Sequence, residues 1–329
     1  MNEVKVKIGF VPSYRFRFGS WGEKMRKDSL SAYAKVNGLE IVVPQPSPDG
    51  KSLDPQSGYV PYGAVTNLDQ AEVVAEYFSN QKVDGLILCP VDFGDERSAV
   101  KVAEKLNVPV MLYATKEPPA LDDLGLSRAS DSYCGNLSMA SGLYRRKIPF
   151  HFAGIFFPEE QEFVSEVDAF VRAVAVVKGL KGIRIGQVGV RPGTFETVGY
   201  DETALIRKFK QNVIFANISD LTDKALSYAD DDPRIQDIIS DIKNSVTTLS
   251  VANDYLLNSA KLELALTEFW TNNRLSALAV QCWSSIQRLM GISVCAIYGR
   301  LTGQRMLTAC ETDVLGALAM ITSYQSAMG

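Results

Sequence analysis

The chain has 329 residues, more than one ordinary domain requires, and this length predicts two domains. Its formal net charge is −4 and, apart from the isolated Arg145-Arg146-Lys147, it has no basic cluster, so nucleic acid is excluded as a partner. No apolar run is long enough to span a membrane, and the N-terminus leads into a strand without a signal-peptide core. We therefore expect a cytoplasmic protein with no membrane partner.

Strand-like and helix-like patterns alternate along the chain, which predicts an α/β fold with largely parallel sheets flanked by helices. In the first half, strands are predicted at 4–11, 39–43, 83–90, 108–113 and 150–156, and helices at 23–36, 95–106, 131–146 and 159–177. Another helix is expected after Asn67, because Asn67 and Gln70 have the spacing of a capping box. The long helix at 159–177 is expected to lead into a second domain.

The second half of the chain repeats this alternation. Strands are predicted at 183–190, 213–217 and 278–281, and helices at 201–210, after Ser219, after Asp232-Pro233 and at 250–272. A short helix, an apolar segment at 292–298 and a strand-to-helix junction after 306–308 follow. We predict two Rossmann-like domains, at 1–178 and 179–329, with the second carrying Gln281 and Glu311.

The segment 44–65 is rich in proline and glycine and is predicted to be a long loop. Loops of this length in compact domains are usually functional or mobile. A lid or subunit contact and a variable surface loop are equal alternatives at this point.

Cysteine and histidine usage limits the metal sites that the chain can build. The cysteines are Cys89, Cys134, Cys282, Cys295 and Cys310. This odd, scattered set argues against a disulfide framework, and the lack of C-x-x-C spacing argues against zinc. Most of them are expected to be small buried apolar residues. The single histidine, His151, lies in an apolar run, which favours a core or edge-strand role and excludes a multi-histidine site in this chain.

Polar and aromatic residues follow the first predicted strand. Arg15 and Arg17 alternate with aromatic residues in a loop that reaches Trp21, and such a loop binds a polar ligand by hydrogen bonding and stacking or packs against a subunit or the surface. We favour binding. The chain has neither the G-x-G-x-x-G fingerprint of dinucleotide sites nor a phosphate-binding P-loop.

Two later strand ends carry further candidates for substrate binding. Arg191 lies between Gly189 and Gly193 in a loop that permits close approach of a ligand, although the turn also suits a structural role. Gln281 offers a donor and an acceptor for a sugar hydroxyl, and Trp283 offers an apolar face for sugar C–H groups.

Glu311 and Asp313 lie where a short strand leads into a helix. Ligands of α/β proteins bind at the carboxyl ends of strands, and a carboxylate there can bind a hard metal ion or act as a base. For Asp313, favourable interaction with the helix N-terminus is an equal alternative.

The segments 279–283, 291–301 and 309–317 together resemble the L-fucose/L-arabinose isomerase group, and are most similar to its L-fucose isomerase-like branch. The resemblance implies an enzyme that interconverts aldoses and ketoses with a divalent metal, typically Mn²⁺. It also implies two Rossmann-like domains followed by a third, mostly β domain, and homo-oligomers with sites built between subunits.

The resemblance assigns roles to individual residues. Glu311 corresponds to a glutamate that binds the metal and takes part in proton transfer, and Gln281 to a glutamine that contacts the substrate. By position alone, the loop from Arg15 to Trp21 falls where the family's first domain reaches a neighbouring subunit's site. The family's other metal ligands lie downstream, and the chain stops at Gly329, so the third domain is absent and we expect no tightly bound metal in this chain alone.

Two functional hypotheses follow. The first is that the chain is the N-terminal, two-domain fragment of a metal-dependent aldose–ketose isomerase that acts on a small-molecule sugar through an enediol and is inactive alone. The alternative is a non-catalytic cytosolic carbohydrate-binding or sensor protein. Glu311 separates them, because an isomerase requires the carboxylate, whereas a simple binder can use an amide. We favour the fragment, and the sequence does not identify the sugar.

Overall fold

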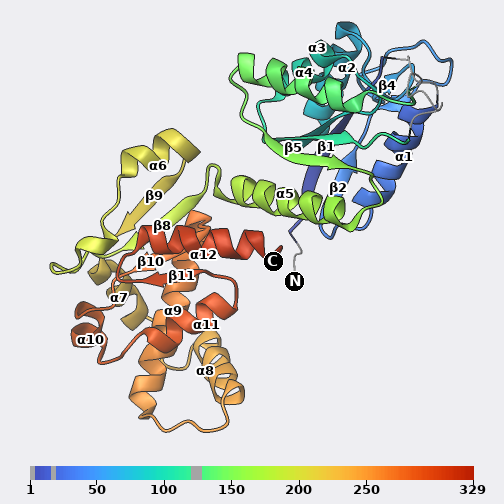
Figure 1. The fold of residues 1–329 in the computed structure, drawn as a ribbon. Helices are drawn as coiled ribbons and strands as arrows, with labels where there is room; N and C mark the ends of the chain where they lie inside the picture. Colours follow the sequence, from blue (N-terminus) through green and yellow to red (C-terminus); the bar gives the residue numbers. More distant parts are fainter. Residues whose placement is uncertain (1–3, 16–19, 120–127) are drawn as a thin grey trace. The chain divides into compact units, whose positions relative to one another are not determined.

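The structure, a computed structural model, describes residues 4–15, 20–119 and 128–329. The chain forms two compact units, Met1–Lys178 with Ser326–Gly329, and Gly179–Gln325 (Figure 1). The expected second domain ran to residue 329, whereas the last four residues group with the first unit. Two contacts explain this difference: Val4 donates a backbone hydrogen bond to Met328 at 3.2 Å, and Arg172 donates to the Ser326 carbonyl at 2.8 Å.

The first unit contains a five-stranded parallel sheet in the order β2-β1-β5-β6-β7. Its strands are β1 (Val6–Ser13), β2 (Leu39–Val42), β5 (Gly85–Pro90), β6 (Val110–Thr115) and β7 (His151–Phe156). Its helices are α1 (Trp21–Tyr33), α2 (Leu68–Gln81), α3 (Glu96–Leu106), α4 (Ser132–Arg145) and α5 (Gln161–Leu180), the last of which leads into the second unit.

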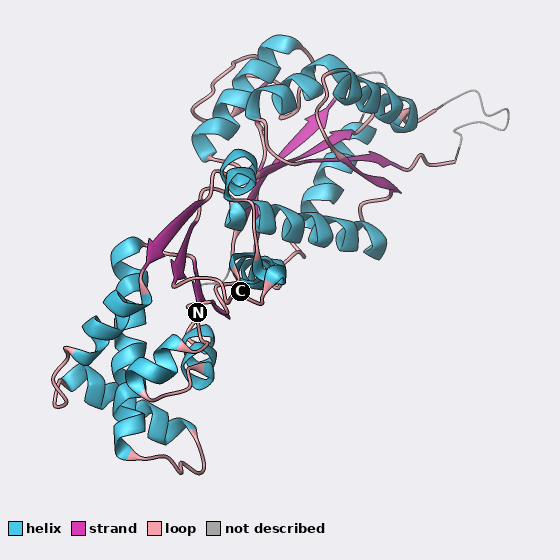
Figure 2. Ribbon diagram, turned by 90° about the vertical axis from the view of Figure 1, so that its left-hand side faces the viewer, coloured by secondary structure: helices cyan, strands magenta, loops and turns pink. Residues whose placement is uncertain are grey.

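Both faces of this sheet are covered by helices (Figure 2). On one face, Phe10 of β1 and Tyr33 of α1 pack with Phe163 of α5, and on the other, Val74 of α2 packs with Val100 of α3. Strands β5 and β6 are buried along their whole length, which is why they read as continuous apolar runs in the sequence.

Side-chain caps fix the starts of two helices in the first unit. The Asn67 side chain accepts a hydrogen bond from the Gln70 backbone N–H at 3.0 Å, so the predicted N-cap is confirmed. The Gln70 side chain accepts from Thr66 rather than from Asn67, so the reciprocal half of the capping box is shifted by one residue. Asp95 caps α3 through the Ser98 N–H at 2.9 Å.

The second unit contains a four-stranded parallel sheet in the order β11-β10-β8-β9. Its strands are β8 (Arg184–Val188), β9 (Asn212–Ala216), β10 (Ala277–Val280) and β11 (Thr308–Cys310). Its helical segments are η1 (Glu196–Val198), α6 (Glu202–Phe209), α7 (Ile218–Leu226), α8 (Pro233–Ser245), α9 (Asn253–Asn273), α10 (Ser285–Met290), α11 (Cys295–Gly303) and α12 (Val314–Ser326).

Helices also cover both faces of the second sheet. Residues of α7, α9 and α11, such as Leu262 and Leu301, pack on one face, and Ala317 and Ile321 of α12 pack on the other. The predicted fold class, α/β with largely parallel sheets flanked by helices, is therefore confirmed. None of the helices in the described part of the chain is long and apolar enough to cross a membrane.

The segment 44–65 contains a small parallel pair, β3 (Gln45–Pro46) and β4 (Tyr59–Val60). Val60, Ala64 and Val65 are fully buried, and the Val65 N–H donates to the Pro12 carbonyl at 2.9 Å. The second half of this segment is thus part of the first unit's packing and not only a surface loop. Whether it acts as a lid or subunit contact stays a prediction.

A close helix contact generates a test of this fold. Gly135 of α4 lies so near the backbone of Phe93 that an added Cβ would overlap the Phe93 carbonyl oxygen. We expect Gly135→Ala to reduce the free energy of unfolding by about 1–3 kcal/mol in urea, because α4 must move away from the sheet. Gly142→Ala in the same helix is the matched control, because its Cβ would meet only the side chain of Val100, at 3.1 Å. Equal effects of the two substitutions would contradict the packing of α4.

Candidate functional site

A pocket lies at the carboxyl ends of the strands in the second unit, where the chain changes direction across the sheet. In the sheet, β8 lies between β9 and β10, so the strand order reverses after β9. Ligands of open α/β sheets bind in the crevice that such a reversal of strand order leaves. The pocket has a volume of about 670 Å³. It is lined by Gln187, Gly189, Val190, Phe215, Ala216, Asn217, Ile218, Ser219, Asp220, Gln281 and Ser285.

Gln281 directly follows β10 and is 7% exposed. Its side-chain oxygen accepts a hydrogen bond from the Val190 N–H at 3.1 Å, and its side-chain nitrogen donates to the Trp283 carbonyl at 2.7 Å. Gly189 has φ +85°, and a Cβ there would lie 2.5 Å from the Gln281 side-chain oxygen. The absence of a side chain at Gly189 therefore leaves space for the Gln281 side chain. Gln281 holds the loops after β8 and β10 together and forms part of the pocket wall.

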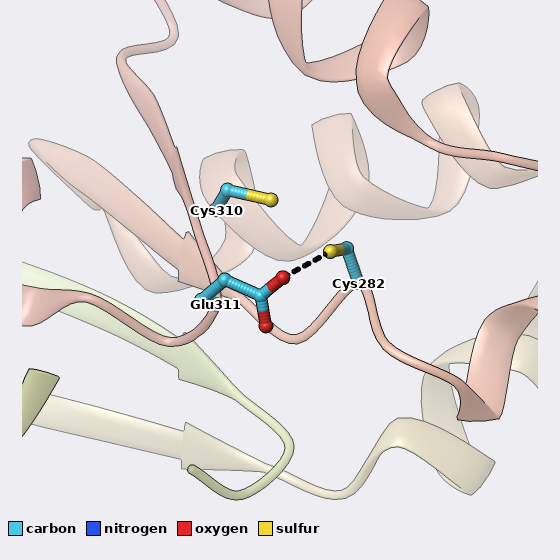
Figure 3. A group of neighbouring side chains, drawn as sticks. All are labelled: Cys282, Cys310 and Glu311. Atoms are coloured by element: carbon cyan, nitrogen blue, oxygen red, sulfur yellow. Dashed lines mark hydrogen bonds between the residues drawn. The ribbon is translucent and has the colours of Figure 1, made fainter. Parts of the chain in front are cut away.

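Glu311 follows β11 and lies beside two thiols (Figure 3). Cys282 donates a hydrogen bond from Sγ to Glu311 Oε1 at 2.7 Å. Cys310 lies next to them, and one ligand atom from each of the three residues lies within 4.8 Å of the others. Strand pairing produces this cluster, because Val280 of β10 is in register with Cys310 of β11.

The backbone at Glu311 adopts an unusual conformation. Glu311 and Thr312 have φ +59° and +55°, a left-handed region that costs residues other than glycine of order 1 kcal/mol each. The Glu311 Oε2 atom is buried and has no hydrogen-bond partner within the part of the chain that the structure describes. A strained backbone that holds an unpartnered carboxylate oxygen in the interior is typical of a functional position, because an unpaired buried acceptor is otherwise costly.

Burial raises the pKa of the Cys282 thiol well above its ordinary value, and the hydrogen bond to Glu311 and the neighbouring Cys310 act in the same direction. Cys282 is therefore a neutral thiol at neutral pH. It supplies a proton donor to the carboxylate and no competing negative charge.

Asp313 does not join the Glu311 cluster. Its Oδ1 accepts a hydrogen bond from the Gly316 N–H at 2.7 Å, and its backbone carbonyl accepts from Ala317 at 2.9 Å, so Asp313 caps α12. Of the two alternatives for Asp313, this geometry supports the helix N-terminus.

Trp283 and Arg191 lie in exposed loops near the pocket in the second unit. Trp283 is 60% exposed and packs against Phe195, with ring centroids 6.3 Å apart. Arg191 directly follows Val190, which lines the pocket, and its guanidinium has no salt bridge to a carboxylate among the described residues. Both side chains can meet a ligand that enters the pocket from solvent.

The remaining predicted binding residues belong to the first unit. Arg15 donates through its guanidinium to the Gly94 carbonyl at 2.9 Å, pairs with Glu96 at 2.9 Å and lies 4.0 Å from the centroid of the Phe93 ring. Trp21 begins α1, and its Nε1 atom is buried and has no hydrogen-bond partner among residues 4–15, 20–119 and 128–329. Arg17 lies outside the described residues. All three of these contacts join Arg15 to residues of the first unit.

The first unit has a pocket of its own at an equivalent reversal, between β1 and β5. It has a volume of about 400 Å³ and is lined by Tyr14, Gly22, Glu23, Pro46, Pro61, Tyr62 and Asp92. Tyr14 donates from its hydroxyl to Glu23 Oε2 at 2.9 Å, and the buried Asp92 carboxylate accepts from the Arg15 N–H at 3.0 Å. These contacts hold Tyr14 and Arg15 in place after the end of β1.

His151 lies outside both pockets. It begins β7, the edge strand of the first sheet, where its Nε2 atom lies 3.0 Å from the Glu166 carboxylate. The imidazole is half-exposed, so the edge-strand alternative holds and the core alternative does not.

The donor atoms around Glu311 do not match the metal that the resemblance implies. Manganese prefers carboxylate, carbonyl and water oxygens, whereas the cluster supplies one carboxylate and two thiols. Asp313 is engaged as a helix cap and adds no ligand. The described residues therefore do not fit a manganese site by themselves.

Sequence reasoning missed Cys282 and Cys310 as members of a site. Both are adjacent to residues that it did select, Gln281 and Glu311, and both lie at strand ends. Their proximity arises from the pairing of β10 with β11, which sequence spacing does not reveal. Reasoning from strand ends could also have selected Asn217, which follows β9 and lines the pocket.

Comparison with known proteins gives a consistent assignment. Residues 49–181 match the N-terminal domain of fucose/sulfoquinovose isomerases. A sulfoquinovose isomerase from Alkalicoccus urumqiensis is 26% identical over 239 residues, which cover 72% of this chain and 52% of the relative. Another from Clostridium sp. (strain MSTE9) is 27% identical over 244 residues, which cover 73% of this chain and 53% of the relative.

Among solved structures, a periplasmic solute-binding protein from Actinobacillus succinogenes 130z with bound D-allose aligns over 98% of this chain and 92% of its own. The sequence identity is 13% and the TM-score is 0.25, so this likeness carries no weight in the assignment.

The fold and the Glu311 site define an α/β protein with a ligand pocket at the carboxyl ends of a parallel sheet. The matches above support the fucose isomerase-like group, which is the family that the resemblance predicted. The chain spans about half the length of these two sulfoquinovose isomerases.

The cap geometry makes a prediction for Asp313. We expect Asp313→Ala to lower the free energy of unfolding by about 1 kcal/mol, because the Gly316 N–H loses its acceptor. Asp313→Asn should change it little, since the amide oxygen can replace the carboxylate. Urea titration of both variants measures the difference, and a loss of stability in Asp313→Asn equal to that in Asp313→Ala would contradict the cap.

Proposed function

We propose that the chain forms part of an aldose–ketose isomerase and that Glu311 is its proton-transfer residue. The observation that carries this proposal is the unpartnered, buried Glu311 oxygen at a strand end, on the same sheet edge as the pocket. The family assignment supports the reaction type, since the relatives are named sulfoquinovose isomerases.

In the proposed reaction, the Glu311 carboxylate removes the proton from C2 of the open-chain aldose. The C2–H electron pair forms the C1–C2 double bond of an enediol, and the carbonyl oxygen at C1 takes a proton from solvent. Glu311 then returns its proton to C1 as the C2 hydroxyl releases its own proton to solvent and becomes the ketone. Cys282 supports the carboxylate by donating a hydrogen bond to Oε1 and leaves Oε2 for the proton.

The proposed substrate is a sulfonated six-carbon aldose of the kind that the relatives' name denotes. The pocket offers hydroxyl-binding groups in Gln187, Asn217 and Ser285, and the exposed face of Trp283 suits sugar C–H groups. Arg191 supplies the positive charge that a sulfonate requires. L-Fucose and L-arabinose, which the resemblance also suggests, have no anionic group and would not need it.

Manganese belongs to this proposal as the metal that would polarise the sugar oxygens. Glu311 is the one hard ligand that the cluster offers it, so the other oxygen ligands would come from outside the described residues. We also propose a homo-oligomer with sites between subunits, in keeping with the family resemblance.

A non-catalytic carbohydrate-binding protein is the second candidate. It is favoured by the orientation of Glu311, because Oε1 is occupied by the Cys282 thiol and Oε2 is buried, so this structure presents no free base to solvent. A binding protein would retain affinity for the sugar when Glu311 is replaced by glutamine.

The proposed role of Glu311 is tested by turnover of the complete gene product. We expect Glu311→Gln to lower kcat for sulfoquinovose isomerisation in the presence of Mn²⁺ by about 10²–10⁴-fold, because the amide cannot accept the proton. Asp313→Asn is the matched acidic control and should retain activity. Wild-type turnover that survives in Glu311→Gln would refute the role, and sugar binding without turnover in the wild type would favour the second candidate.

The proposed role of Arg191 is tested by substrate preference. We expect Arg191→Ala to reduce kcat/KM for sulfoquinovose by about 10- to 100-fold, because a charged hydrogen bond is lost, and to leave that for L-fucose nearly unchanged. Arg207→Ala, at an exposed arginine of α6, is the control. Equal losses on both sugars would show that Arg191 does not recognise the anionic group.

A further inference from the structure

Helix α4 lies at the surface of the first unit (Figure 1). Its inward residues, such as Met139 and Leu143, belong to a core cluster of that unit. Its solvent side carries large apolar side chains instead: Tyr133 is 51% exposed, Leu137 is 57% exposed and Tyr144 is 80% exposed. Their spacing of four and seven residues places these three side chains on one face of the helix.

The half-buried Ala140 completes this face, and we call Tyr133, Leu137, Ala140 and Tyr144 the α4 stripe. Residues 132–144 of α4 contain no charged residue. The neighbouring α3 differs, because its solvent side is charged through Glu96, Arg97, Lys101, Glu104 and Lys105. A surface helix normally carries charged or polar residues on its solvent side, and an exposed apolar patch marks an interaction site. The α4 stripe is therefore a candidate contact with another protein surface.

The two ends of the α4 stripe carry charges of opposite sign. At the start of α4, Glu117 and Asp131 interact with each other and share Arg128, which lies 3.3 Å from Asp131. At the end of α4, the basic segment 145–147 is exposed. Glu104 is the one carboxylate that pairs with this segment within the described part of the chain. One end therefore has an excess of negative charge and the other an excess of positive charge.

A second copy of the chain complements this surface when two α4 helices run antiparallel. A two-fold axis near the midpoint of the stripe places Tyr133 of one copy opposite Tyr144 of the other, and Leu137 opposite Ala140. A large side chain then meets a small one at the centre, which permits close packing of the helices. The acidic start of each helix meets the basic segment of the other copy, whereas a parallel pair would bring like charges together.

We propose that the α4 stripe is a self-association surface, at which two copies of this chain pair through antiparallel α4 helices. A hollow of about 650 Å³ at one end of the stripe is lined by Tyr144, Arg145, Lys147, Ile148, Pro149 and Phe150. It can receive the Tyr133 ring of the second copy, and aromatic rings in such pockets anchor protein interfaces. This surface would be one contact of the homo-oligomer proposed above, on which the inference rests.

Sedimentation velocity of the present chain tests this contact. We expect a dimer in the wild type and at least about tenfold weaker dimerisation in Leu137→Asp, because the substitution brings two carboxylates into the apolar centre of the pair. Leu68→Asp is the matched control, because Leu68 is an exposed leucine at the first position of α2, where a carboxylate is favourable. It should dimerise as the wild type does, and circular dichroism verifies that each variant is folded.

Disulfide cross-linking tests the antiparallel geometry. Ala140 lies near the two-fold axis, so Ala140→Cys should link two copies when the thiols are oxidised with diamide. In an antiparallel pair, Tyr144 lies about 16 Å along the helix from its equivalent, so Tyr144→Cys should not link. Peptide mapping distinguishes these links from any that the native cysteines form. A disulfide through the Tyr144→Cys position would indicate a parallel pair and would overturn the arrangement.

The outcomes separate this contact from the other proposals. Dimerisation of Leu137→Asp equal to that of the wild type would overturn the α4 contact and leave other contacts of the homo-oligomer standing. A wild type that is monomeric at every concentration tested would overturn both the contact and the homo-oligomer. Neither result bears on Glu311 as the proton-transfer residue, because no turnover is measured.

Discussion

Parallel pairing of β10 with β11 is the constraint on which the candidate site depends. It brings the carboxyl ends of two strands that are about thirty residues apart in sequence to one sheet edge, with Val280 opposite Cys310. The residues that follow, Cys282 and Glu311, then meet through a thiol–carboxylate hydrogen bond. The pairing of β8 with β10 does the same for the pocket, since it allows Gln281 to reach over Gly189 and join two strand-end loops. A change of register in either pair would separate these groups.

Two features of Glu311 each cost folding free energy, and packing of the fold does not explain either of them. Its backbone and that of Thr312 are left-handed, and one of its carboxylate oxygens is buried with no donor from the described residues. Both costs fall on the residue that the family resemblance selects, whereas the nearby Asp313 satisfies its carboxylate by capping a helix. In the isomerase proposal, the unpartnered oxygen holds a proton during turnover.

The sequence was sufficient for the fold class and for most elements, because buried parallel strands such as β5 and cap residues such as Asn67 leave strong local patterns. It could not reveal the role of Gln281, which depends on the absence of a side chain at Gly189. It left Asp313 undecided because a carboxylate at a helix start suits both a cap and a ligand. It missed the two thiols because their proximity depends on strand order. It could not reveal that Glu96, eighty-one residues away, pairs with Arg15, and the binding of a ligand by Arg15 stays a prediction.

Solvent isotope exchange tests the central claim most directly, because it follows the proton that Glu311 is proposed to move. The complete gene product would be incubated with sulfoquinovose in D₂O with Mn²⁺, and the ketose examined by NMR. The account predicts deuterium at C1 of the product in the wild type, and neither label nor product with Glu311→Gln. Ketose formed without deuterium would indicate a hydride shift or a proton shielded from solvent. Labelled ketose from Glu311→Gln would contradict the account, because another residue would then carry the proton.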